Sequence, residues 1–410
     1  MLPNGVRVLT DVVGSSSSAT IGIWVGVGGR DEPDRLAGAS HFLEHLVFKG
    51  SPRRNALQVA LEMDGIGGEM NAYTASEYTA YYARVPAPEL EFATDLLLDV
   101  VGSPALRPEE FDAEREVILE ELAAADDDPE DVVGVQLFEA MFPDHALGRE
   151  VLGSRVSIGA LGRDDVAAFL DEWYCPANMV VTGAGKVDHD RLVAQVDAVI
   201  GGRGQGSAPS RGAPPPPVDA VVCSHDPGDL VHVALGWRSA GVHDVDRFAL
   251  AILNHVLGAG PSSRLFQRVR EERGLTYSIS SGVSQFSDAG AMTASCAVTP
   301  AKAATLLDVV DAEVAALVEH GITDEELARS KRSMRGSMLL GLEDSGTRSS
   351  RLGLSETVRG QVTPIEQHLA RLDAVELDDV AAIAASVLGG PRVTSLVGPG
   401  ELEALAARPS

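Results

Sequence analysis

The 410-residue chain contains only three cysteines, and their placement excludes two kinds of site. Cys175, Cys223 and Cys296 are odd in number and far apart in the sequence. They therefore form neither a disulfide framework nor a Cys-x-x-Cys metal site. We expect three buried thiols.

The sequence also lacks a long apolar run. No stretch approaches the roughly 18 to 20 apolar residues of a transmembrane helix. The opening residues MLPNGVRVLTD have neither the basic nor the apolar region of a signal peptide. Apolar residues make up 45% of the chain and charged residues 23%, as in soluble globular proteins. We therefore expect a cytoplasmic protein without membrane contact.

Basic residues are scarce relative to acidic ones. The chain has 33 Lys and Arg against 60 Asp and Glu, which gives a net charge of −27. This balance argues against nucleic-acid binding, because phosphates would be repelled. An acidic surface would suit basic peptide partners, although solubility alone explains the charge equally well.

A Gly- and Pro-rich stretch divides the chain almost equally. Residues 201–217 read GGRGQGSAPSRGAPPPP, with four consecutive prolines that stiffen the end of the stretch. A chain of this length is expected to form two to three domains. We therefore predict one domain over residues 1–200, a linker over 201–217 and a second domain over 218–410.

The two halves are internal copies. The segment IGIWVGV (21–27) alternates apolar residues with the period of a half-buried strand, and VHVALGW (231–237) keeps that register 210 residues later. The same offset places HFLEHLVFKG (41–50) on AILNHVLGAG (251–260). Such a repeat predicts two domains of one fold.

Each copy continues with strands and then helices. Residues 65–85 and 273–298 read as the strands of a hairpin or meander. Helical segments are expected at about 87–101, 108–125, 301–319 and 324–342. We predict an α+β fold built twice, each domain a mainly antiparallel sheet with helices packed on one face.

The segment HFLEH in the first copy carries a candidate metal site. On a helix, His41 and His45 project from one face, with Glu44 beside them. Two such imidazoles can bind Zn²⁺, and a neighbouring carboxylate can act as a base. An amphipathic helix with incidental histidines is the alternative. The second copy keeps His255 but has Ala251 and Asn254 at the other two positions.

A third ligand is sought on the helix expected at 108–125. Glu114 and Glu121 are seven residues apart and share a face, with Val117 and Ile118 also expected to point inward. A carboxylate completes a two-histidine zinc site. Aligning the repeats places two serines opposite these glutamates in the second copy, Ser330 and Ser337.

These motifs together resemble the pitrilysin/insulysin metallopeptidases. They comprise HFLEH, the spacing of 76 residues from His45 to Glu121, MNAYTASEYTAYY and REERGLTYS. The branch that looks most similar is that of bacterial peptidases similar to the mitochondrial processing peptidase β subunit. The resemblance extends over nearly the whole chain, from LPNGVRVLT through YCPANMVVTGAGKVDHDRL to RVTSLVGPG.

The resemblance implies specific roles. His41, His45 and Glu121 would bind one Zn²⁺ per chain, Glu44 would be the general base, and Glu114 would orient a ligand. An edge strand to which an extended peptide adds would comprise Asn71, Ala72, Tyr73 and Thr74. From the second half, Arg270 and Tyr277 would hold the substrate backbone and the oxyanion.

The implied function is that of a zinc-dependent endopeptidase or oligopeptidase acting on extended, unstructured peptides. Active enzymes of the family enclose peptides between four such domains, so a two-domain chain implies a dimer, with itself or with a related subunit. The family's non-catalytic processing partners carry a long glycine-rich loop in the second half, whereas the matching segment here, GAGPSSR, is short, so the resemblance favours a homodimer. The alternatives are a non-catalytic assembly subunit, like the family's core proteins in a respiratory complex, and a structural zinc site, although structural sites usually have four protein ligands.

Overall fold

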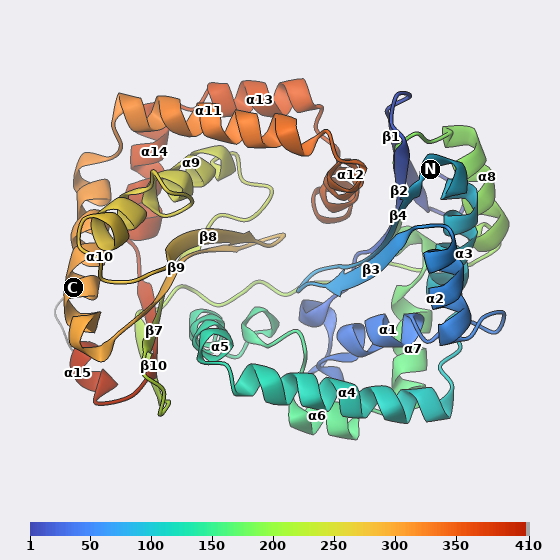
Figure 1. Ribbon diagram of the computed structural model, residues 1–410, viewed down its shortest axis with the longest axis horizontal. Coiled ribbons are helices and arrows are strands. Elements are labelled where there is room, and N and C mark those ends of the chain that lie inside the picture. Colours follow the sequence, from blue (N-terminus) through green and yellow to red (C-terminus); the bar gives the residue numbers. More distant parts are fainter. Residues whose placement is uncertain (407–410) are drawn as a thin grey trace. The chain divides into compact units, whose positions relative to one another are not determined.

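The computed structural model describes residues 1–406 and divides the chain into two compact units (Figure 1). Unit 1 contains Met1–Leu122, Glu150–Gly212 and Met338–Thr363. Unit 2 contains Ala123–Arg149, Ala213–Ser337 and the described residues from Pro364 onward. Each unit is built on a five-stranded sheet.

The sheet of unit 1 is mainly antiparallel. Its strand order is β1-β5-β2-β4-β3, and only the β1–β5 pair is parallel. The strands are β1 (Arg7–Val12), β2 (Ser18–Val25), β3 (Glu69–Thr74), β4 (Thr79–Pro86) and β5 (Met179–Gly185). The helices that begin in this unit are α1 (Ala39–Val47), α2 (Ala56–Gly65), α3 (Leu90–Gly102), α4 (Pro108–Asp126), α6 (Arg155–Ala160), α7 (Arg163–Trp173), α8 (His189–Ile200) and α12 (Ser345–Arg359).

Unit 2 repeats this topology. Its strand order is β6-β10-β7-β9-β8, again with one parallel pair, β6–β10. The strands are β6 (Ala220–His225), β7 (Val231–Ser239), β8 (Ile279–Gln285), β9 (Gly290–Val298) and β10 (Arg392–Gly398). The helices that begin in this unit are α5 (Pro129–Met141), α9 (Arg247–Leu257), α10 (Pro300–His320), α11 (Asp324–Gly341), α13 (Ile365–Asp373), α14 (Leu377–Ile383) and α15 (Leu402–Ala406). The predicted α+β fold and its duplication are confirmed.

The predicted alternation of apolar residues along β2 and β7 determines which face of each sheet packs into the main core. In β2, Ile21, Ile23 and Val25 are fully buried in the core of unit 1, which also includes side chains of α1, α3, α7 and α8. In β7, alternate residues from Val231 to Trp237 occupy the equivalent core of unit 2. Burial of these β-branched and aromatic side chains is the main stabilising contribution of each sheet.

The opposite face of each sheet is covered by a helix from the other half of the sequence. Helix α12 contacts β1, β2 and β5 of unit 1, where Thr20 Oγ1 lies 2.9 Å from Ser345 Oγ. Helix α5 contacts β6, β7 and β10 of unit 2, where Met141 packs against Gly236. Helices therefore cover both faces of each sheet, whereas we predicted helices on one face.

This exchange changes the predicted division of the chain. Residues 123–149 belong to unit 2 and residues 338–363 belong to unit 1. The predicted domains, 1–200 and 218–410, place both segments in the wrong unit. The physical reason is that each sheet has a second buried face that needs cover. Residues 201–219 themselves form no helix or strand in the described chain. The first part of this stretch is fixed to unit 1, because the Arg211 guanidinium donates to Asp31 at 2.8 and 2.9 Å.

The three cysteines are unpaired, as predicted, but they are not all buried. Cys175 is buried, whereas Cys223 on the edge strand β6 and Cys296 on β9 are partly exposed. Among the described residues, no helix is both long and apolar enough to cross a membrane.

Candidate metal centre

Helix α1 presents both histidines of the first copy on one side. Its other side carries Phe42, Leu43 and Leu46, which are buried in the core of unit 1 and fix the orientation of the helix. The first turn is held by the buried Glu32, which accepts from the amides of Gly38 and Ser40 at 2.6 Å each. A carboxylate at this end also suits the helix dipole.

Helix α4 brings the predicted third ligand to the histidines. The Phe42 and Phe111 rings stack with centroids 4.5 Å apart and join the two helices. Glu121 Oε2 then lies 3.8 Å from His41 Nε2 and 3.6 Å from His45 Nε2. Ile118 is fully buried, as expected, but Val117 is 44% exposed, so its predicted inward position is wrong. The buried face of α4 is narrower than the one we predicted.

Glu114 fixes one of the histidine rings. Its Oε2 lies 3.0 Å from His45 Nδ1, and its Oε1 lies 2.5 Å from Lys49 Nζ. Glu114 is 5% exposed, so these two contacts account for both carboxylate oxygens. A carboxylate that accepts from Nδ1–H leaves His45 Nε2 free to coordinate.

Glu44 lies beside this cluster and contacts the edge strand. Thr74 Oγ1 donates to Glu44 Oε2 at 2.5 Å. Burial raises the pKa of Glu44 above its ordinary value, although the Thr74 hydrogen bond opposes the shift. Burial, with the neighbouring His45, lowers the pKa of His41 to about 4. His41 is therefore neutral at pH 7, the state in which an imidazole binds a metal.

The residues fit a zinc ion. Among the described residues, His41, His45 and Glu121 form a group whose candidate ligand atoms all lie within 4.8 Å of one another. Two imidazole nitrogens and one carboxylate are the protein ligands of many catalytic zinc sites, in which a fourth position stays open. The structure thus brings together every ligand predicted from the sequence.

The predicted substrate strand is an edge strand. Strand β3 pairs only with β4, so one edge of it has no partner strand in the described part of the chain. The Ala72 amide donates to Asn71 Oδ1 at 2.8 Å. The Tyr73 ring packs edge-on against Trp24, with centroids 6.2 Å apart, on the face of the sheet opposite α1. An unpaired strand edge can accept an added peptide strand.

The two predicted residues of the second half belong to unit 2 and contact each other. The Arg270 guanidinium lies 4.9 Å from the centre of the Tyr277 ring and 4.6 Å from that of Phe266. Tyr277 is 85% exposed. Their role with substrate stays a prediction.

The second copy keeps part of the geometry of the first but only one of its three candidate metal ligands, the histidine at position 255. His255 Nδ1 lies 3.0 Å from Ser330 Oγ, which reproduces the contact between His45 and Glu114. Asn254, at the position of Glu44, accepts from Ser281 Oγ at 2.6 Å. The alignment made from the sequence is therefore correct at this helix pair, and within residues 1–406 the three-ligand cluster occurs in unit 1 alone.

Sequence reasoning missed Lys49 and Glu32. Lys49 lies in the turn just beyond the end of α1, so helical spacing did not predict its contact with Glu114. Glu32 lies in an irregular segment, and no pattern predicted that its carboxylate would cap α1.

Two family models match the chain. One, described as insulinase (peptidase family M16), matches residues 7–155, and the other, described as the peptidase M16 inactive domain, matches residues 160–334.

Proteins of similar sequence carry the name of zinc proteases. One from Mycobacterium leprae, named an uncharacterized zinc protease, is 42% identical over 408 residues, which cover 97% of this chain and 91% of that protein. One from Bacillus subtilis, with the same description, is 32% identical over 397 residues and 97% of both chains.

Solved structures share the fold at low sequence identity. A protease from Helicobacter pylori has a TM-score of 0.92 at 23% identity, with 97% of this chain and 98% of that chain covered. A chain of complex III2 from Candida albicans has a TM-score of 0.85 at 18% identity, with 97% of this chain and 95% of that chain covered.

Proposed function

We propose, from the premise that this chain belongs to the insulinase family of peptidases (family M16), that it is a zinc-dependent endopeptidase acting on extended, unstructured peptides. The observation that carries the proposal is the cluster of His41, His45 and Glu121, whose candidate ligand atoms lie within 4.8 Å of one another. Glu44 lies beside this cluster, on the same helix as the two histidines. The second copy has kept the helix and His255 but has lost the counterparts of His41, Glu44 and Glu121, which favours a dedicated function over packing.

One family model is described as an inactive domain, but this description does not concern the cluster. That model matches residues 160–334, which contain none of the three ligand residues. The insulinase model matches residues 7–155, which contain all three and Glu44. The proposal therefore assigns the chemistry to unit 1.

Three residues would hold the metal, and a fourth would move the proton. His41 and His45 would bind through Nε2 and Glu121 through a carboxylate oxygen, with Glu114 fixing the ring of His45. When bound, zinc supplies Lewis-acid polarisation of the peptide carbonyl and makes water more acidic. Glu44 takes a proton from the attacking water and returns it to the leaving amine. The Thr74 hydrogen bond holds the Glu44 carboxylate in one orientation.

The substrate would lie along β3 as an added strand. Backbone pairing of this kind accepts many side chains, which suits a peptidase of broad specificity. Arg270 and Tyr277 would assist from unit 2, and two chains would associate to complete the enclosure around the peptide. Basic peptides are favoured by the net charge of −27. A cytoplasmic location also stays a prediction.

A non-catalytic assembly role is the second candidate, and the similarity in fold to a chain of complex III2 favours it. An assembly subunit needs no metal ligands, whereas this chain has the complete set and the adjacent base. The two candidates differ in whether the purified chain cleaves peptides.

The test uses a mixed set of unstructured peptides and four proteins. Glu44→Gln should keep the zinc content of the native chain and lose cleavage by about 10²- to 10⁴-fold, because it removes a general base and no ligand. Glu121→Gln should lose zinc, whereas Glu120→Gln, an exposed neighbour on α4, should behave as the native chain does. A native chain that holds zinc and cuts nothing would favour the assembly role.

A further inference from the structure

Lys49 contacts the metal centre through Glu114. It lies just beyond the end of α1, and its Nζ is 2.5 Å from Glu114 Oε1. The other oxygen of Glu114 lies 3.0 Å from His45 Nδ1. Glu114 is therefore held at both oxygens, by an ammonium on one side and an imidazole on the other. Charge-assisted contacts of this kind fix the orientation of a carboxylate more firmly than neutral ones.

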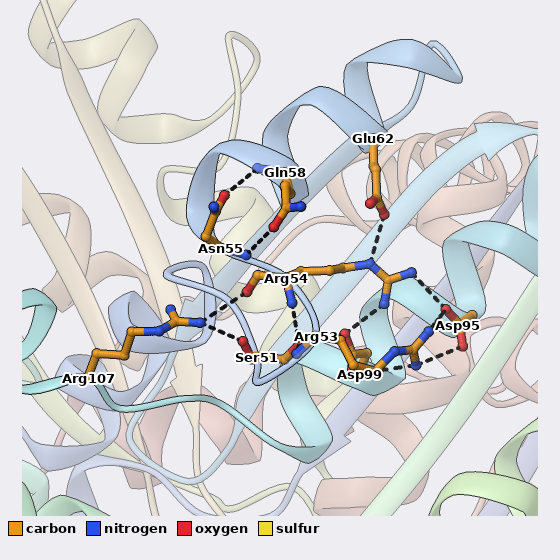
Figure 2. Close-up of polar contacts among 9 residues, drawn as sticks. All are labelled: Ser51, Arg53, Arg54, Asn55, Gln58, Glu62, Asp95, Asp99 and Arg107. Carbon is orange, nitrogen blue, oxygen red and sulfur yellow. Dashed lines mark hydrogen bonds and ion pairs between the residues drawn. The ribbon is translucent and has the colours of Figure 1, made fainter.

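The backbone that delivers Lys49 is itself fixed. Arg107, just before α4, donates to the carbonyl of Lys49 at 3.2 Å and to that of Ser51 at 2.7 Å. Ser51 Oγ in turn donates to Asp99 of α3 at 2.7 Å (Figure 2). Gly50 has φ of +103°, and a Cβ there would lie 2.2 Å from the Arg54 carbonyl, so this turn requires glycine. The loop between α1 and α2 thus has little freedom.

Internal duplication provides a natural comparison. The offset of 210 residues places Ala259 opposite Lys49, and Ser330 lies where Glu114 would be. His255 and its hydrogen bond to Ser330 persist at 3.0 Å. The second copy has therefore kept the histidine and lost both the lysine and the carboxylate. Lysine and carboxylate occur together, in the copy with the three metal ligands.

We propose that Lys49 is a positioning residue of the metal centre. Its ammonium holds Glu114 Oε1, so that Oε2 accepts from His45 Nδ1 and His45 Nε2 points at the metal. This role rests on the proposed zinc site. Residues that orient a ligand in this way typically contribute about 10- to 100-fold to metal affinity.

A purely structural reading is that Lys49 neutralises a buried carboxylate and stabilises unit 1. The two readings differ in the metal affinity expected after Lys49 is substituted. If Lys49 is only structural, the substitution lowers stability and leaves the affinity of the folded protein for metal unchanged. If Lys49 is a positioning residue, the substitution weakens metal binding by the folded protein, and it does so only while Glu114 is present.

The experiment measures Zn²⁺ affinity by competition with a chromophoric chelator and the visible spectrum of the Co²⁺ form. Lys49→Met should bind Zn²⁺ about 10- to 100-fold more weakly than the native chain and should show altered Co²⁺ bands. Lys49→Arg, which keeps a cation, should restore most of the affinity. In a Glu114→Gln background, Lys49→Met should add no further loss, because the lysine acts through the carboxylate.

Unit 2 offers a matched control. Arg264 holds the loop after α9 to the first turn of α11 through two contacts of 2.8 Å with Glu326. Arg264→Met should lower the unfolding temperature and leave Zn²⁺ affinity within about twofold, a smaller change than that of a ligand-orienting residue. Native affinity in Lys49→Met, or losses that add fully in the double variant, would overturn the proposal while leaving the zinc site intact. A native chain without zinc affinity would overturn both.

Discussion

Substitution of Gly353 on α12 tests whether this helix, from the second half of the sequence, packs on the sheet of unit 1. Three small residues at a spacing of four, Ser345, Ser349 and Gly353, form the side of α12 that lies on the sheet of unit 1. A Cβ at Gly353 would lie 2.0 Å from atoms of the Trp24 ring. Trp24 is 1% exposed, and its Nε1 donates to Thr182 Oγ1 at 3.1 Å. The ring therefore cannot withdraw without losing this bond.

The expected sign of Gly353→Ala follows from one stabilising and two destabilising contributions. Replacing glycine by alanine inside a helix stabilises a protein by about 1 kcal/mol when space is available. Overpacking of a filled core costs about 1–3 kcal/mol, and a lost buried hydrogen bond costs about 1 kcal/mol more. We expect a net loss of about 1–3 kcal/mol in the free energy of unfolding.

Gly134 on α5 is the matched control, because a Cβ there would have no neighbour within 4 Å among the described residues. Gly134→Ala should raise stability by about 1 kcal/mol. Urea unfolding followed by far-ultraviolet circular dichroism measures both changes as shifts of the transition midpoint. A Gly353→Ala variant as stable as the native chain would refute the packing of α12 on β2. Equal losses of stability in both variants would show that the loss in Gly353→Ala does not come from the contact with Trp24.

Two further predictions concern ion pairs. Arg54→Met should lose about 3–5 kcal/mol in urea unfolding, because Arg54 is 9% exposed and pairs with Asp99 at 2.7 Å (Figure 2). The exposed Arg53→Met should lose about 1 kcal/mol or less, and equal losses would contradict the importance of burial. Although burial opposes the shift, the Arg264 ion pair lowers the pKa of Glu326. The ion pair therefore stabilises the fold at pH values above the pKa of Glu326 in the unfolded chain, about 4.3. This stabilisation is lost as the pH falls through the lower pKa that Glu326 has in the folded protein. The stability difference between the native chain and Arg264→Met should shrink below about pH 4, and a constant difference in acid titrations of the unfolding temperature would contradict the shift.

The repeated fold could be predicted because its signals are local and occur twice. Alternation in β2 and β7 and the offset of 210 residues gave the sheets, and the predicted helices agree with α3, α4, α10 and α11 within a few residues. Helix α12 could not be placed, because its buried side consists mostly of small residues, which in a sequence are typical of exposed positions. Its partner surface, which includes Gly22 and Thr182, is equally inconspicuous.

The candidate site could be predicted where helical spacing dictates geometry. His41 and His45 share a face because they are four residues apart, and the structure places them as expected. The position of Glu121 needed the family resemblance, since no local rule brings α4 against α1. The carboxylate of Glu32 and the ammonium of Lys49 reach the site through loop conformations, which sequence periodicity does not describe.

The most direct test of the account is zinc titration of the metal-free chain. After removal of metal by a chelator, peptide cleavage should be absent and should rise linearly to a maximum at one zinc ion per chain. Glu44→Gln should take up the same amount of zinc and stay inactive. Cleavage that persists without metal, or a native chain that binds no zinc, would contradict the assignment of His41, His45 and Glu121 as the ligands of a catalytic metal.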